Sequence, residues 1–149
     1  MSKNALHYSS QEPSVALTPA TVVDDSWSDQ GAEFSTHGAV GIAVNFTLTP
    51  HATLDIDVLK WRALLRVSKE GADHQEQKYA GDQETISVRE HKFDTTSSHL
   101  NLLAAQPAVS AYFLVDSAGF EFCQLQIYSE DTVGAGIPTV AALEIRRLS

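Results

Sequence analysis

Residues 39–49 read AVGIAVNFTLT, and in this stretch every even position is a large apolar residue while every odd position is small or polar. A period of two residues places alternate side chains on opposite faces of an extended strand. The stretch therefore predicts a half-buried β-strand with one face toward a core and the other toward solvent. Similar periodicity recurs in segments 54–67, 109–115, 120–128 and 139–148.

The chain shows no comparable signal for helices. No segment combines a sustained helical stripe of apolar residues with a start and a stop signal. Turn-forming residues separate the predicted strands at intervals of about eight to twelve residues, which is typical of two-sheet proteins. The sequence therefore predicts an all-β fold, an antiparallel two-sheet β-sandwich with jelly-roll or Greek-key connections. The apolar positions change phase between Val58 and Leu59, which predicts a β-bulge there.

The beginning of the chain differs in composition from the rest. Residues 1–19 are rich in Ser, Gln, Asn and Thr, contain two prolines and have few large apolar groups, so they predict an extended N-terminal arm. Residues 20–149 are expected to form the β-sandwich domain. This domain is predicted to begin with a short strand at 20–23 and a polar turn at 24–31.

The composition of the chain argues against some classes of binding partner. The chain has 149 residues, a formal net charge of −9 and a pI near 4.9, which opposes attraction to nucleic acid and to anionic membranes. No apolar segment is long enough for a signal peptide or a membrane helix, so we expect a soluble protein made in a cytoplasm. Cys123, the only cysteine, lies in an apolar segment and is predicted to be a buried, inert thiol.

The sequence shows no arrangement of residues that predicts a catalytic or metal-binding site. The six histidines are scattered without the short spacings that bring two imidazoles onto one metal ion. Asp24, Asp25 and Asp29 flank Trp27, and we interpret them as turn aspartates rather than as calcium ligands. There is no G-x-S-x-G motif and no glycine-rich phosphate loop. We therefore predict a protein that is not an enzyme, with no catalytic residue, no metal and no cofactor.

Other residues are candidates for contact with a partner. An extended arm can pack against a neighbouring subunit, and Trp27 is an aromatic residue in a predicted polar turn. The last predicted strand ends in the densest positive charge of an acidic chain, and arginine is enriched at protein contacts. The candidate partner interface comprises Pro13, Val15, Leu17, Trp27, Arg146 and Arg147.

Residues 21–31, TVVDDSWSDQG, are followed by the alternating strand from Ala39 and by the long strand through Trp61. In this order the chain resembles small β-sandwich structural proteins of tailed bacteriophage virions. The resemblance implies a decoration or cement subunit, made in the host cytoplasm and located on the capsid surface, that stabilises the capsid by binding across subunit junctions. It also implies a homo-oligomer whose partners are the major capsid protein or other virion proteins, with no nucleic acid and no membrane.

Two alternatives from other classes stay open. A head-tail or tail connector protein would have the same sequence character but few copies in each particle. A carbohydrate- or receptor-binding β-sandwich module would require Trp27 and at least one tyrosine on a common exposed surface.

Overall fold

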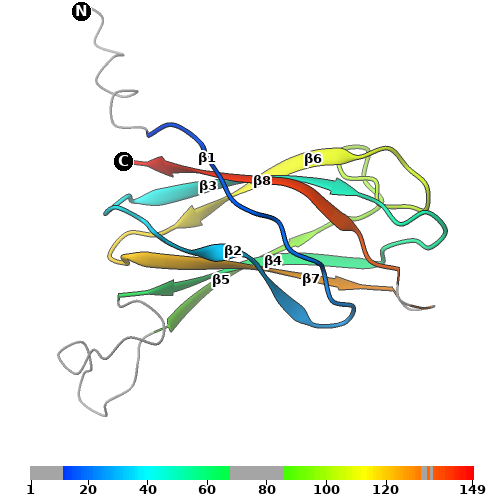
Figure 1. Ribbon diagram of the computed structural model, residues 1–149, viewed down its shortest axis with the longest axis horizontal. Helices are drawn as coiled ribbons and strands as arrows, with labels where there is room; N and C mark the ends of the chain where they lie inside the picture. The colour runs from blue at the N-terminus through cyan, green and yellow to red at the C-terminus, as the bar shows by residue number, and fades with distance from the viewer. Residues whose placement is uncertain (1–11, 68–85, 132–133, 135) are drawn as a thin grey trace, which may run out of the picture.

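The computed structural model describes residues 12–67, 86–131, 134 and 136–149. These residues form two four-stranded antiparallel sheets that face each other, without any helix in this part of the chain (Figure 1). The predicted fold class, an all-β antiparallel sandwich of two sheets, is confirmed. The strands are β1 (Val15–Ala16), β2 (Trp27–Ser35), β3 (Gly41–Thr49), β4 (Val58–Arg66), β5 (Ile86–Phe93), β6 (Val109–Asp116), β7 (Phe122–Glu130) and β8 (Thr139–Leu148).

The order of the strands identifies the topology. The first sheet has the order β1-β8-β3-β6 and the second sheet the order β2-β7-β4-β5. Each strand of the first half of the chain pairs with its counterpart in the second half: β1 with β8, β2 with β7, β3 with β6 and β4 with β5. This nested pairing is that of a jelly roll, in which one long antiparallel ribbon folds over into two sheets.

The core lies between the two sheets and follows from the alternation of apolar residues. On β3, Ile42, Val44, Phe46 and Leu48 are buried, and the residues between them point to the outer face. The ring of Phe46 contacts that of Trp61 on β4, with 4.9 Å between the centroids. Burying a large apolar side chain contributes about 1.5 to 3 kcal/mol. The alternation therefore fixes which face of the first sheet points inward.

The segment around Trp27 contradicts the sequence prediction. The predicted turn at 24–31 lies largely in β2, and no strand forms at 20–23. Gln30 points into the core and is fully buried, and its amide group exchanges two hydrogen bonds of 2.8 Å with the backbone of Ala20. A polar side chain satisfied in this way can occupy a core position. The apolar alternation that marks the other strands is therefore missing here.

Within the predicted arm, residues 12–19 run along β8. The backbone N–H of Leu17 donates to the carbonyl of Leu143 at 2.9 Å, and the Leu17 side chain packs against the core. Gly31 makes this packing possible, because a Cβ at Gly31 would lie 3.0 Å from the Cβ of Leu17 and its φ is +72°. The described part of the arm is thus the edge of the first sheet, and residues 1–11 lie outside the described residues.

The β-bulge predicted near Val58 and Leu59 does not form. β4 keeps an unbroken register with both β5 and β7. The apolar phase changes because β4 begins only at Val58, while Ile56 is buried from the connection that precedes the strand. A register shift occurs instead in β2, between Gln30 and Phe34.

Candidate interaction surface

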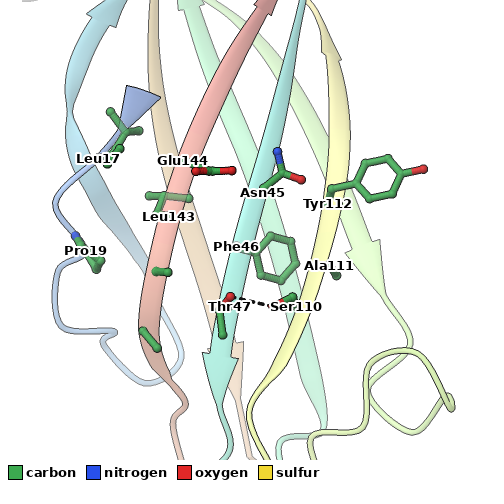
Figure 2. Close-up of a pocket in the computed structure, with 13 residues that line it drawn as sticks. Leu17, Pro19, Asn45, Phe46, Thr47, Ser110, Ala111, Tyr112, Leu143 and Glu144 are labelled. Atoms are coloured by element: carbon green, nitrogen blue, oxygen red, sulfur yellow. Dashed lines mark hydrogen bonds between the residues drawn. The ribbon is translucent and has the colours of Figure 1, made fainter. Parts of the chain in front are cut away.

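The outer face of the first sheet contains a shallow trough. The β3 residues that point to this face are short, and so is Ala142 opposite them on β8, which leaves space above the sheet. The trough has a volume of about 620 Å³ (Figure 2). Its lining includes Leu17, Asn45, Thr47, Tyr112, Ala142 and Glu144. Short side chains in the middle of the sheet therefore form a concave surface on this side of the molecule.

Apolar residues border the trough on two sides. Figure 2 shows Leu17 and Pro19 on the β1 side and Tyr112 projecting from β6 on the opposite side. Tyr112 is 65% exposed. Between these sides, the hydroxyl groups of Thr47 and Ser110 share a hydrogen bond of 2.7 Å. Apolar sides around a mostly neutral polar centre suit contact with a protein segment, since large exposed aromatic residues mark interfaces.

The three arm residues that were predicted to contact a partner differ in their position relative to the trough. Val15 is 42% exposed on β1, where it pairs with Ile145 of β8. Pro13 is also exposed. Leu17 turns toward the sandwich and lines the trough. Of the three, only Leu17 belongs to the concave surface.

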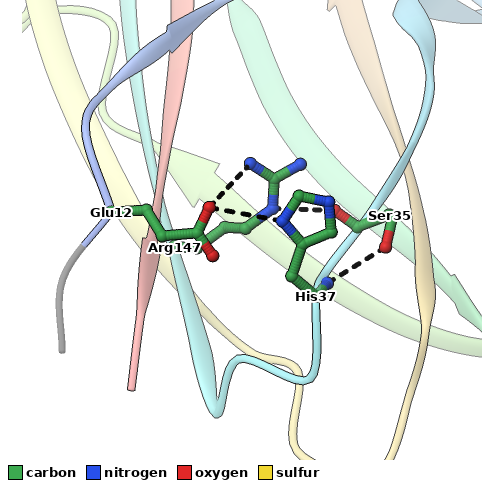
Figure 3. A network of polar contacts seen from close by, with 4 residues as sticks. All are labelled: Glu12, Ser35, His37 and Arg147. Carbon is green, nitrogen blue, oxygen red and sulfur yellow. Dashed lines mark hydrogen bonds and ion pairs between the residues drawn. The ribbon is translucent and has the colours of Figure 1, made fainter.

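Arg147 is held within the chain. It is only 6% exposed, its Nε donates to the carbonyl oxygen of Ser35 at 2.8 Å, and its guanidinium lies 3.7 Å from Glu12 Oε1 (Figure 3). The same oxygen of Glu12 lies 3.2 Å from Nδ1 of His37. Arg147 therefore links β8 to the arm and to the end of β2.

Arg146 points to the outer face of the same sheet. Its side chain is exposed and donates to Ser14 Oγ at 3.1 Å. Glu144, two residues earlier on β8, lines the trough. Of the two predicted arginines, Arg146 is the one that lies beside the trough and can reach a partner.

Over β2, β7 and β4, the outer face of the second sheet is covered by its own side chains. Trp27 of β2 and Tyr128 of β7 are cross-strand partners, with 5.5 Å between their ring centroids. The guanidinium carbon of Arg62 lies 4.1 Å from the centre of the Trp27 ring, and Lys60 Nζ lies 4.5 Å from that of Tyr128. These are cation–π distances. The predicted contact residue Trp27 is therefore half-buried beneath a cation of its own chain.

Hydrogen bonds extend this covering layer. Arg62 Nε donates to Gln126 Oε1 at 2.7 Å, and the amide nitrogen of Gln126 donates to Asp29 Oδ1 at 2.7 Å. The hydroxyl of Tyr128 donates to the carboxylate of Asp25. This bond is the main cause that raises the pKa of Tyr128 above its ordinary value, because it is lost when the phenol ionises. Asp25 and Asp29 thus bind side chains of β7.

The single cysteine is unsuited to nucleophilic chemistry. Cys123 is buried, as predicted, and burial together with the negative charge of Glu33 raises the pKa of its thiol to about 12. In the part of the chain that the structure describes, no group of three or more His, Cys, Asp or Glu side chains is placed to hold a metal ion. The same residues include no helix long and apolar enough to cross a membrane.

Sequence reasoning missed the trough. It singled out aromatic and charged residues, whereas the trough is formed mainly by small or neutral residues such as Asn45, Thr47 and Ala142. The signal was present in residues 39–49, because the same alternation that places large residues inside places small ones outside. A row of small outward-facing residues indicates a trough only when the residues on the neighbouring strands are known.

Comparison with known proteins gives no assignment. No known protein family matches the chain, and no curated protein matches its sequence. The function of the surface has to be argued from its geometry and chemistry.

Proposed function

We propose that this chain is a non-enzymatic virion structural protein, a decoration or cement subunit that stabilises a bacteriophage capsid by binding across capsid subunit junctions. The observation that carries the proposal is the asymmetry of the sandwich. One outer face is covered over β2, β7 and β4 by its own aromatic and charged side chains, and the other has an open trough between Leu17 and Tyr112. A jelly roll with one open face is a compact unit for covering a surface, and this fold occurs in viral capsid proteins.

The trough is the surface that meets the capsid in this proposal. Its sides are apolar, and Glu144 with the neighbouring Arg146 offers one charge of each sign to polar groups of a capsid protein. A protein that binds only the assembled shell stabilises that shell by mass action. The stabilisation is about 3 to 4 kcal/mol for each site when the protein is present at about 100 to 1,000 times its dissociation constant.

The carbohydrate-binding alternative has weaker support. Stacking against a sugar needs a free aromatic face, and Arg62 already lies over the ring of Trp27 at 4.1 Å. Tyr112, which is freely exposed, lies on the outer face of the other sheet. Trp27 and Tyr128 do share the outer face of the second sheet, but Arg62 and Lys60 already lie over their rings at 4.1 and 4.5 Å. A connector role would use the same trough and differs from a cement role in copy number.

The proposal is tested by co-sedimentation of the purified protein with capsids of the encoding phage that lack it. Ala142→Trp fills the trough and is expected to raise the dissociation constant from capsids at least about tenfold, which corresponds to about 1.4 kcal/mol. Lys92→Trp, which adds the same side chain to the outer face of the second sheet, is the matched control and should bind normally. Equal binding by wild type and Ala142→Trp would refute the assignment of the trough, and no binding by folded wild type would refute the cement role.

A further inference from the structure

Among the described residues, three of the four sheet edges are protected against pairing with another strand. β1 has two residues and is flanked by Pro13 and Pro19. β2 is interrupted by the register shift between Gln30 and Phe34. β5 carries four charged or titratable residues in a row at 89–92. Short strands, prolines, bulges and charges are the features by which natural proteins prevent edge-to-edge association.

The fourth edge, β6, has none of these features. It pairs with β3 in one unbroken register over eight residues. Its sequence VSAYFLVD contains no Lys, Arg or Pro, and its only charge is Asp116 at the end. Tyr112 and Leu114, which point outward from alternate positions, are 65% and 55% exposed. A regular, largely apolar edge strand without charge along its middle is a template for pairing with another strand.

The backbone of β6 also presents hydrogen-bonding groups to this edge. His91 Nε2 lies 3.2 Å from the carbonyl oxygen of Leu114, so this oxygen points away from β3. In an antiparallel strand alternate residues direct their N–H and C=O groups to the same side, so Ser110 and Tyr112 present theirs as Leu114 does. A carbonyl oxygen has two lone pairs, and the contact with His91 leaves room for a second donor.

We propose that β6 pairs antiparallel with β6 of a second copy of this chain across a two-fold axis at Phe113. In this register Tyr112 lies opposite Leu114 of the second copy, and Ser110 lies opposite Asp116 of the second copy. Both pairs join residues that point to the outer face, as continuous sheets require. Two identical aromatic–aliphatic pairs form, and such cross-strand pairs stabilise a sheet.

Charge favours a second copy at this edge. With a net charge of −9 the chains repel each other, so self-association needs a surface without like-charge contacts. The β6 pairing places no two charges opposite each other. The β6 dimer joins two first sheets edge to edge, and it does not depend on the proposed capsid function.

The test is sedimentation equilibrium of the purified full chain up to about 100 μM, a range that populates interfaces of micromolar affinity. Wild type is expected to reach the mass of two 16.2 kDa chains. Tyr112→Lys and Leu114→Lys each change an exposed side chain and should each raise the dimer dissociation constant at least about tenfold. Val88→Lys places the same charge at an exposed position of β5 and should leave the dimer intact. Circular dichroism confirms folding, and the two β6 variants are independent of each other.

A disulfide trap tests the register. Ser110→Cys combined with Asp116→Cys is expected to give a cross-linked dimer on oxidation, because directly opposite residues have the Cα spacing that a disulfide needs. Ser110→Cys alone is the control and should not cross-link, while the native Cys123 is buried. A wild type that stays monomeric, forms a trimer, or forms a dimer that Tyr112→Lys and Leu114→Lys leave intact would overturn the proposal.

Discussion

The two outer faces of the sandwich are built on similar sheets and differ in what covers them. On the second sheet, Trp27, Tyr128 and Arg62 contact one another and form hydrogen bonds with their neighbours. On the first sheet, short residues such as Asn45 and Thr47 leave an open trough. Side chains that already bind each other gain little from a partner. Short side chains lose little conformational entropy when a partner covers them, so the open face is the better interface.

The largest effect is expected for Phe46, which lies beneath the trough. Phe46→Ala should lower the free energy of unfolding by about 3 to 5 kcal/mol, because it leaves a cavity beside Trp61 in the shared core. Urea denaturation measures this loss. The result would show that the open face lies above a tightly packed core. A loss below about 1 kcal/mol would mean that the trough reflects a loosely packed sheet.

The next comparison uses the two neighbouring arginines of β8. Arg147→Met should cost about 2 to 3 kcal/mol of unfolding free energy, since the buried guanidinium donates to the carbonyl of Ser35. Arg146→Met removes the same group from an exposed position and should stay within about 0.5 kcal/mol of wild type. Thermal or urea unfolding of both variants measures the two losses of unfolding free energy. Equal losses would contradict the assignment of Arg147 to a structural role.

Aromatic residues on the two faces give a smaller contrast. Trp27→Ala should destabilise the fold by about 1 to 2 kcal/mol, because Trp27 packs between Tyr128 and Arg62. Tyr112→Ala on the open face should change the free energy of unfolding by less than about 0.5 kcal/mol, measured at a concentration where the chain is monomeric. If Tyr112 proves to matter more for stability than Trp27, the distinction between the two faces fails.

The smallest effect concerns the pH dependence of Tyr128. Its hydrogen bond to Asp25 raises its pKa in the folded state above the value of about 10 for an unfolded chain. The stabilisation from this bond is therefore complete below about pH 10 and is lost as the pH rises through the higher folded pKa. A pH titration of wild type and of Tyr128→Phe, followed by near-UV absorbance, measures the ionisation of Tyr128. The variant should lack an ionisation that wild type shows above the ordinary range of tyrosine, and a lost step near pH 10 would contradict the hydrogen bond.

Much of the fold could be predicted from the sequence. β3, β4, β6, β7 and β8 carry a clear alternation of apolar and polar residues, because one face of each strand is buried and the other is not. This pattern was sufficient to identify the two-sheet sandwich. The nested pairing that makes it a jelly roll depends on contacts between distant strands, which one sequence does not display.

The rest was hidden by polar residues in buried positions and by neighbours that come from elsewhere in the chain. β2 was interpreted as a turn because Gln30 occupies a core position through its bonds to Ala20. Arg147 was expected on the surface because its contacts with Glu12 and Ser35 join segments far apart in sequence. The trough needs β1, β8, β3 and β6 side by side, so no local pattern reveals it.

The proposed cement role requires that a bacteriophage encodes this protein, and it is tested most directly by the copy number of the protein in purified virions of that phage, measured by quantitative mass spectrometry. A subunit that binds across junctions repeated over the whole capsid should be present on the order of hundreds of copies per particle, since capsid symmetry repeats each junction. A few to a few dozen copies would contradict the cement role and indicate a connector at the neck or tail. Absence from the virion would contradict a structural role of any kind.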